Sequence, residues 1–272
     1  MVKKRLIFTY LFDGENCVLS RNFRLQKVGT VDWIKKHYSF ESIAFSIDEL
    51  VLINVSRNEH KIDQFCHVIS NLSRFFLMPI AAGGHVRSFD DAKMLLRSGA
   101  DKIILNSPLF TNVNLVKQIA DSFGSQCIVA SIDYLKQNDK TNIYVNNGKD
   151  KLNLSVQDGI NLVLKQNVGE IYLTSMEKDG TGMGFDIDVL KHAVIQSSVP
   201  IIASGGAGDY MHIAQCFSET GITAVSTANL FNFLGNGLFE TRQYLINNGF
   251  SLAKWNNFSD SENQKSKFEK RF

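Results

Sequence analysis

The sequence predicts an α/β protein, a single (β/α)8 TIM barrel built from two homologous half-barrels. Eight short apolar runs rich in β-branched residues alternate with amphipathic segments. Such alternation is typical of a parallel sheet covered by helices, and eight units of this size favour closure into a barrel. Similar segments also recur about 122 residues apart, which predicts two halves. The chain has 272 residues and is 44% hydrophobic, enough to bury the core of one such domain.

The eight apolar runs are the expected strands, and they cover residues 6–12, 50–55, 76–82, 102–106, 126–132, 170–174, 200–204 and 224–227. Helices are expected between them and at 237–247. Capping boxes open two of these helices, one at Ser88 with Asp91 and one at Ser155 with Asp158. The connections 13–30 and 134–153 are longer than ordinary loops and occupy matching places in the two halves. We expect both to cover the site.

The internal repeat is clearest at two glycine turns. Residues 79–84 read Pro-Ile-Ala-Ala-Gly-Gly, and residues 200–208 read Pro-Ile-Ile-Ala-Ser-Gly-Gly-Ala-Gly, so that Gly205 follows Gly83 by 122 residues. A strand, a glycine turn and a helix N-terminus present free backbone N–H groups to a phosphate. Two such turns predict a ligand with two phosphates, or with one phosphate at each end.

The bulk properties exclude several classes of protein. A net charge of +2 gives no case for a nucleic-acid partner, and no apolar run is long enough to cross a membrane. The four cysteines lack paired spacing, which favours a reduced, cytoplasmic location. Residues 6–12 follow a basic stretch but are read as the first strand, not a signal peptide. We expect the barrel to span 1–254, with 255–272 a polar, disordered tail. No metal-binding cluster or dinucleotide motif appears, so no cofactor is expected.

Functional groups of a barrel lie at the carboxyl ends of its strands. Asp133 follows one buried run and is a candidate general acid or base, although a helix-capping or loop aspartate explains it equally well. Asp13 follows the first strand, where we interpret it as a solvated turn residue. The other substrate-binding candidates at strand ends are mostly small or polar residues: Thr174, Asp179, Thr181, Ser204 and Gly205.

Three motifs carry a resemblance to a known family. They are residues 123–126 (Phe-Gly-Ser-Gln), residues 173–175 (Leu-Thr-Ser) with 179–181 (Asp-Gly-Thr), and the turn at 201–208. From about residue 5 to residue 250 the chain resembles the cyclase subunit of imidazole glycerol phosphate synthase. The resemblance implies a glutaminase partner on the N-terminal face of the barrel. It also implies that ammonia crosses the barrel and is added to a ribulosyl substrate with a phosphate at each end.

The resemblance also assigns residues to roles. A gate for ammonia is implied at Arg5, Glu49, Lys102 and Glu170, where the alternative interpretation is a solvated ring of salt bridges. One catalytic aspartate is Asp133. The implied phosphate contacts are Gly84, Asn106 and Ser107 in the first half, and Gly180, Gly206, Ala228 and Asn229 in the second. His85 stands where the family has a third glycine.

Three departures from the family concern its chemistry. Leu11 stands where the other catalytic aspartate is expected, Leu19 replaces a lysine, and Asn54 replaces an aspartate. One hypothesis is therefore a true cyclase that makes imidazole glycerol phosphate in histidine biosynthesis. The favoured hypothesis is a divergent paralogue that passes ammonia to another acceptor or to a third subunit, in the amidation of surface-polysaccharide sugars. A carboxylate facing Asp133 in the space left by Leu11 would contradict the favoured hypothesis. An isomerase or aldolase is disfavoured because no lysine ends a strand.

Overall fold

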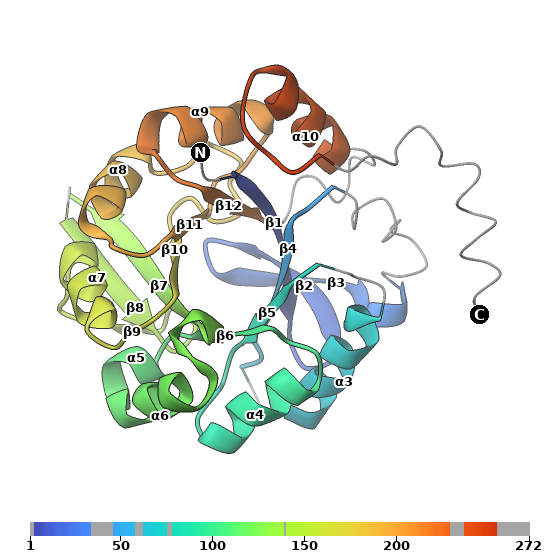
Figure 1. Ribbon diagram of the computed structural model, residues 1–272, viewed down its shortest axis with the longest axis vertical. Coiled ribbons are helices and arrows are strands. Elements are labelled where there is room, and N and C mark those ends of the chain that lie inside the picture. The colour runs from blue at the N-terminus through green and yellow to red at the C-terminus, as the bar shows by residue number, and fades with distance from the viewer. Residues whose placement is uncertain are drawn as a thin grey trace.

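The computed structural model describes residues 3–33, 46–57, 62–74, 78–138, 140–228 and 237–254. Eight parallel strands close into a barrel with helices around it (Figure 1). In barrel order the strands are β1 (Arg5–Phe12), β4 (Glu49–Asn54), β5 (Ile80–Gly83), β6 (Lys102–Leu105), β7 (Ile128–Gln137), β10 (Glu170–Ser175), β11 (Ile201–Ser204) and β12 (Ala224–Thr227). Strand β12 pairs with β1, which closes the barrel and confirms the predicted fold class.

The described helices lie between successive strands, and α10 follows the last strand, as the alternation predicts. They are α3 (Ile62–Ser73), α4 (Phe89–Arg97), α5 (Pro108–Thr111), α6 (Val113–Phe123), α7 (Val156–Leu164), α8 (Ile187–Gln196), α9 (Tyr210–Thr220) and α10 (Gly237–Asn247). Ser88 and Ser155 form the two expected capping boxes at the starts of α4 and α7. The predicted tail, 255–272, lies outside the described residues, as does part of the connection between β3 (Arg24–Thr30) and β4.

The two long connections differ from the expected loops, because both contain antiparallel strands. The chain leaves β1 into β2 (Asn16–Arg21) and then β3. In the second half, β7 continues five residues past its predicted end into β8 (Lys140–Val145), and β9 (Asp150–Lys151) follows. Buried residues such as Val18 and Ile143 pack one face of these hairpins inward, an alternation that the sequence analysis overlooked. Both hairpins extend from the carboxyl ends of their parent strands.

A second correction concerns the start of β7. The expected strand began at residue 126, whereas Ser125–Cys127 form a short 3-10 helix (η1). Gly124 precedes η1 with φ 87°, a left-handed conformation that favours glycine. The turn redirects the chain from α6 into β7.

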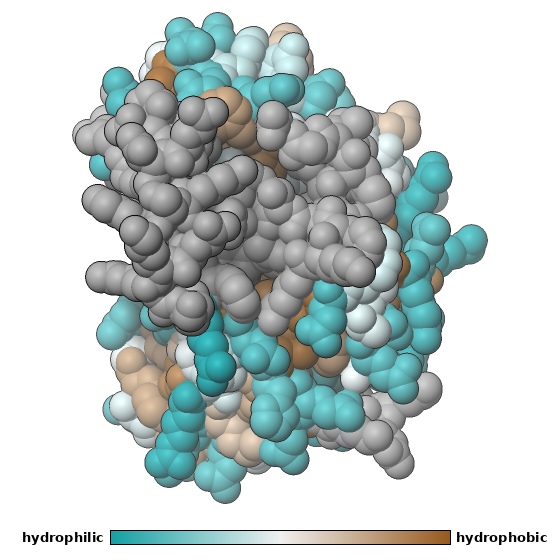
Figure 2. Space-filling view, turned by 90° about the vertical axis from the view of Figure 1, so that its right-hand side faces the viewer, coloured by the Kyte–Doolittle hydropathy of each residue, from teal (hydrophilic) through white to brown (hydrophobic). Residues whose placement is uncertain are grey.

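The apolar side chains form two separate cores. The larger lies between the strands and the helices, and the smaller lies inside the barrel. On the face shown in Figure 2, the described side chains are mostly hydrophilic, with small apolar areas between them. Among the described residues no helix is long and apolar enough to cross a membrane. The inner core is the part of the fold that matters for the site, because it separates the two ends of the barrel.

Candidate active site and the two ends of the barrel

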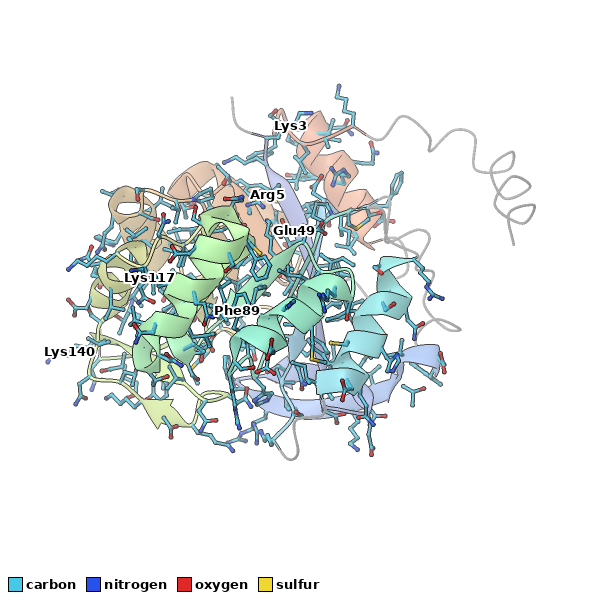
Figure 3. The ribbon with its side chains drawn as sticks, turned by 60° about the horizontal axis from the view of Figure 1, so that its bottom comes forward. Lys3, Arg5, Glu49, Phe89, Lys117 and Lys140 are labelled. Atoms are coloured by element: carbon cyan, nitrogen blue, oxygen red, sulfur yellow. The ribbon has the colours of Figure 1, made fainter. Side chains whose placement is uncertain are left out.

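Four charged side chains form a ring across the amino-terminal end of the barrel. Arg5 Nη1 lies 2.8 Å from Glu49 Oε2, and Arg5 Nη2 pairs with Glu170. Lys102 Nζ lies 2.9 Å from Glu49 and 3.1 Å from Glu170. The two glutamate side chains are only 3% and 7% exposed. Figure 3 shows Arg5 and Glu49 together near the end where the chain enters β1.

Each member of the ring has two partners of opposite sign. Burial raises the pKa of Glu49, although Lys102 and Arg5 lower it. Burial alone would lower the pKa of Lys102, but its two carboxylate partners raise it above its ordinary value. A lone buried charge would be costly, whereas an alternating ring compensates each charge. The structure thus brings together the four residues for which a gate was expected.

Above the ring, the barrel interior is first apolar and then rich in hydroxyl groups. The apolar layer contains Ile7, Val51, Ala81, Ile104, Val129, Tyr172, Ile202 and Ala224. The Tyr172 hydroxyl lies 2.9 Å from Thr9 Oγ1 and 3.0 Å from the hydroxyls of Ser204 and Ser226. Tyr172 therefore caps the apolar layer with a hydrogen-bonded cluster. This cluster lies at the base of a cavity.

The cavity opens at the carboxyl ends of the strands and has a volume of about 550 Å³. Of the candidate substrate and catalytic residues, its lining contains Gly84, Asn106, Ser107, Asp133, Thr174, Asp179, Ser204 and Ala228. The β2–β3 hairpin contributes Ser20, Phe23 and Leu25, and the β8–β9 connection contributes Asn146 and Asn147. The hairpins therefore roof the cavity, as the expected covers should. A half-enclosed cavity of this size suits a small organic ligand.

Asp133 is the group in the cavity best suited to move a proton. It lies in β7, and burial, together with the charge of Asp179, raises its pKa to about 7. Hydrogen bonds with Thr174 and Ser131 act in the opposite direction. Asn106 Nδ2 lies 3.3 Å from Asp133 Oδ2, so that this amide orients the carboxylate. A carboxyl group with a pKa near 7 can act as an acid or a base at neutral pH.

Asp179 is a second carboxylate in the same cavity. It lies between β10 and α8, and burial raises its pKa. Its Oδ2 accepts hydrogen bonds from Ser20 Oγ at 2.5 Å and from the Phe23 backbone N–H at 3.1 Å. Asp179 thus ties the β2–β3 hairpin across the mouth of the barrel. It also places a negative charge near Asp133, which the sequence analysis did not anticipate.

The end of β1 carries no carboxylate in the cavity. Leu11 pairs with Ile53 of β4, and both side chains are among the lining residues. Asp13 is instead a turn residue, as expected, because its Oδ1 accepts hydrogen bonds from the Glu15 and Asn16 backbone N–H groups at 3.1 and 2.7 Å. An aliphatic side chain cannot transfer a proton, so the β1 side of the cavity has no acid or base at this position.

Several candidate residues of the second half do not line the cavity. Gly180, Thr181, Gly205 and Gly206 are not among the lining residues, and Asn229 lies outside the described residues. A Cβ on Gly206 would lie 2.1 Å from Gly184 O, and one on Gly180 would lie 2.1 Å from Ser20 O. Close backbone packing therefore explains why glycine is needed at Gly180 and Gly206, with no need for a ligand. Their expected phosphate contacts remain predictions.

Several lining residues were missed by the sequence analysis. Thr9, Ser131 and Tyr172 lie one pleat below the strand ends, on the same face as the residues that were predicted. Side chains alternate between the two faces of a strand, so residues two positions before the candidate residues at strand ends could have been predicted to face the cavity. Arg57 and Arg87 lie in loops, where the sequence carries no periodicity to show direction. Among the described residues, no group of His, Cys, Asp and Glu is placed to hold a metal ion.

Comparison with known proteins supports the resemblance read from the motifs. Residues 26–235 match the family of histidine biosynthesis proteins. A protein of Parasynechococcus marenigrum (strain WH8102), provisionally named imidazole glycerol phosphate synthase subunit hisF2, is 39% identical over 257 residues, 94% of this chain and 95% of the relative. Imidazole glycerol phosphate synthase subunit HisF of Clostridium botulinum (strain Okra / Type B1) is 34% identical over 255 residues, 93% of this chain and 99% of the relative. The HisF subunit of Streptococcus mutans serotype c is 32% identical, covering 93% of this chain and 100% of the relative. The chain therefore belongs to the histidine biosynthesis protein family and, within it, to the HisF-like cyclase subunits of imidazole glycerol phosphate synthase.

Proposed function

We propose that this protein is the acceptor subunit of a glutamine-dependent amidotransferase, and that it has lost the ring closure of a true cyclase. A glutaminase subunit docks on the amino-terminal face and releases ammonia at the charged ring. The ammonia reaches the cavity, where an acceptor receives it with Asp133 as the proton-transfer group. The observation that carries the proposal is the contrast between a complete charged ring and an aliphatic Leu11 at the mouth.

The barrel interior supports ammonia as the species that crosses. The layer above the ring is apolar, and an unpaired ion entering it would lose its hydration without compensation. Neutral ammonia is small, and its loss of hydration in the apolar layer costs far less free energy. The hydroxyl cluster around Tyr172 then offers hydrogen-bond partners on arrival at the cavity. The Arg5, Glu49, Lys102 and Glu170 side chains must separate for passage, which gives the ring its proposed role as a gate.

The acceptor and the remaining partner follow from the family resemblance. The resemblance implies that paralogues with leucine at the end of the first strand belong with amidotransferases of surface-polysaccharide sugars. We therefore place the acceptor among such sugars, with a third, synthetase-like subunit as a partner. In this proposal the substrate contacts in the cavity are Gly84, Asn106, Ser107 and Thr174, with Asp179 and Ser204 completing the set. The protein acts in the cytoplasm and needs no cofactor.

One observation favours the true cyclase as the second candidate function. Asp179 lies close enough to Asp133 to raise the pKa of Asp133, so that the cavity does hold two carboxylates. Its Oδ2, however, accepts hydrogen bonds from the β2–β3 hairpin. Asp179 is therefore engaged in holding the roof, on a different element from Leu11.

Turnover with ammonium salt separates the two candidates. The purified protein receives the ribulosyl substrate that carries a phosphate at each end, and imidazole glycerol phosphate is measured, with the Clostridium botulinum HisF subunit as the positive control. We expect a rate lower by at least about two orders of magnitude, because one acid or base is missing. Formation of product at a rate comparable to the control would refute the proposal.

The variant Leu11→Asp tests the same reasoning in the opposite direction. A carboxylate introduced at the end of β1 should raise ring-closing turnover by about tenfold or more if it is the principal missing group. The matched control is Leu11→Asn, because asparagine has nearly the volume of aspartate but cannot transfer a proton at neutral pH. Equal turnover of both variants would show that the carboxylate is not what the cavity lacks.

A further inference from the structure

The two halves of the barrel differ in the charges that they bring to the cavity. Arg57 and Arg87 line it, and they follow β4 and β5 of the first half. The repeat places Lys178 and Asp209 at the corresponding positions of the second half, and neither lines the cavity. Asp209 caps α9 by accepting a hydrogen bond from the His212 N–H at 3.0 Å, and Lys178 lines a separate hollow. Positive charge is therefore concentrated on one wall, which we call the arginine wall (Arg57 and Arg87).

Backbone packing holds the arginine wall in place. A Cβ on Gly84 would lie 2.1 Å from Asn54 O, so the turn after β5 rests directly on the end of β4. The next residue, His85, has φ 59° and brings its Nε2 to 2.8 Å from Ser56 O. These contacts join the two loops that carry the arginines. Arg57 Nη2 also donates a hydrogen bond to Phe23 O at 2.8 Å, which fixes its guanidinium beneath the roof.

The rest of the lining adds neutral donors near this wall and three acidic groups, Asp133, Asp150 and Asp179. Asn147 Nδ2 lies 3.4 Å from Ser56 O, which places this amide beside the loop that carries Arg57. Asp133 lies on β7, whereas Asp179 is held at the roof by Phe23, the residue whose carbonyl oxygen accepts the hydrogen bond from Arg57. The exposed Asp150 accepts a hydrogen bond from Asn146 Nδ2 at 2.9 Å. An anionic group is therefore attracted to the arginine wall and away from Asp133 on β7, which orients the ligand.

We propose that the arginine wall binds the diphosphate group of an ester whose uncharged part extends toward Asp133. A guanidinium presents N–H donors in a planar fork that matches phosphate oxygens, and two guanidiniums match two linked phosphates better than one. The cavity of about 550 Å³ has room for such a ligand. The inference rests on the proposed function, since it names the substrate class of the same cavity. It replaces the symmetrical expectation of one phosphate in each half.

Calorimetric titration of the full-length protein with inorganic pyrophosphate and with inorganic phosphate tests the proposal. We expect pyrophosphate to bind at least about tenfold more tightly than phosphate, with an affinity that falls as salt is added. Arg57→Gln and Arg87→Gln should each weaken pyrophosphate binding by about tenfold or more. The controls are Lys178→Gln, at the corresponding position of the second half, and Arg97→Gln, in the last turn of α4. Both controls should stay within about twofold of the parent protein.

Three results would overturn the proposal. They are equal affinity for the two anions, weakening by Lys178→Gln as large as that by the arginine variants, and no pyrophosphate binding at millimolar concentration. Circular dichroism of each variant identifies a change that is due to misfolding, and Arg57→Lys then serves as a second variant that keeps the charge but loses the fork. The readout is binding alone. The absence of pyrophosphate binding would refute this inference and leave the proposed function standing. Formation of imidazole glycerol phosphate at a rate comparable to the control would refute the proposed function and, with it, this inference.

Discussion

We expect Asp133 to make the protein less stable as pH rises from about 4 to about 7, and Asp133→Asn should remove this effect. The pKa of Asp133 is raised from 3.8 to about 7, mainly by burial. Between these values the folded state holds a proton that the unfolded state has released. Stability therefore falls with rising pH by about 1.4 kcal/mol per pH unit, up to about 4 kcal/mol in all. Above pH 7 both states are ionised and the loss is complete.

The assay is urea unfolding of the parent protein and Asp133→Asn at several values between pH 5 and pH 8. The free energy of unfolding of the variant, relative to the parent, should rise by about 2 kcal/mol from pH 5 to pH 7 and then level off. The variant also alters hydrogen bonds to Thr174 and Asn106. This change shifts the difference in unfolding free energy by the same amount at every pH and does not change its dependence on pH. Asp158→Asn is the control, because the pKa of this exposed capping residue is lowered and both states are ionised throughout the range. A pH-independent difference for Asp133→Asn would refute the assignment of a raised pKa.

Two further changes test how the barrel is held together. Gly84→Ala should lower the free energy of unfolding by about 1–3 kcal/mol more than Gly249→Ala. Both glycines have positive φ, but only at Gly84 would an added Cβ collide with backbone atoms. Equal losses in urea unfolding would contradict this expectation. Arg242→Met should cost about 3–5 kcal/mol, because Arg242 is fully buried and makes two hydrogen bonds to Asp48, at 2.6 and 3.0 Å. Lys191→Met is the control: it breaks an exposed ion pair and should lower the free energy of unfolding by at most about 1 kcal/mol. Similar shifts of the melting temperature for the two variants would contradict the role of the buried pair.

The ring at one end and the cavity at the other belong to the same set of strands. Each strand turns alternate residues inward, so that β1 presents Arg5 to the ring, Thr9 to the hydroxyl cluster and Leu11 to the mouth. Replacing Leu11 therefore changes the chemistry at the mouth without touching the ring. This separation explains how a member of the family can keep one end of the barrel while the other changes.

Much of the site followed from the sequence because strand ends converge in a barrel. Asp133, Thr174 and Ser204 were identified by their place at strand ends, and all three lie in the cavity. Glycine turns were less informative. The same glycine that lets a phosphate approach also lets two backbones touch, and at Gly206 the structure shows the second use.

The sequence alone determined the order of strands and helices, the two-fold repeat, the residues at strand ends and the family. These depend on local periodicity and on spacing along the chain, which sequence carries directly. Only the tertiary structure decided that the long connections are hairpins, that Asp179 lies near Asp133, and that Arg57 and Arg87 share one wall of the cavity. Such proximity arises from the packing of loops that are distant in sequence. A pKa near 7 at Asp133 exists only once those loops have excluded water.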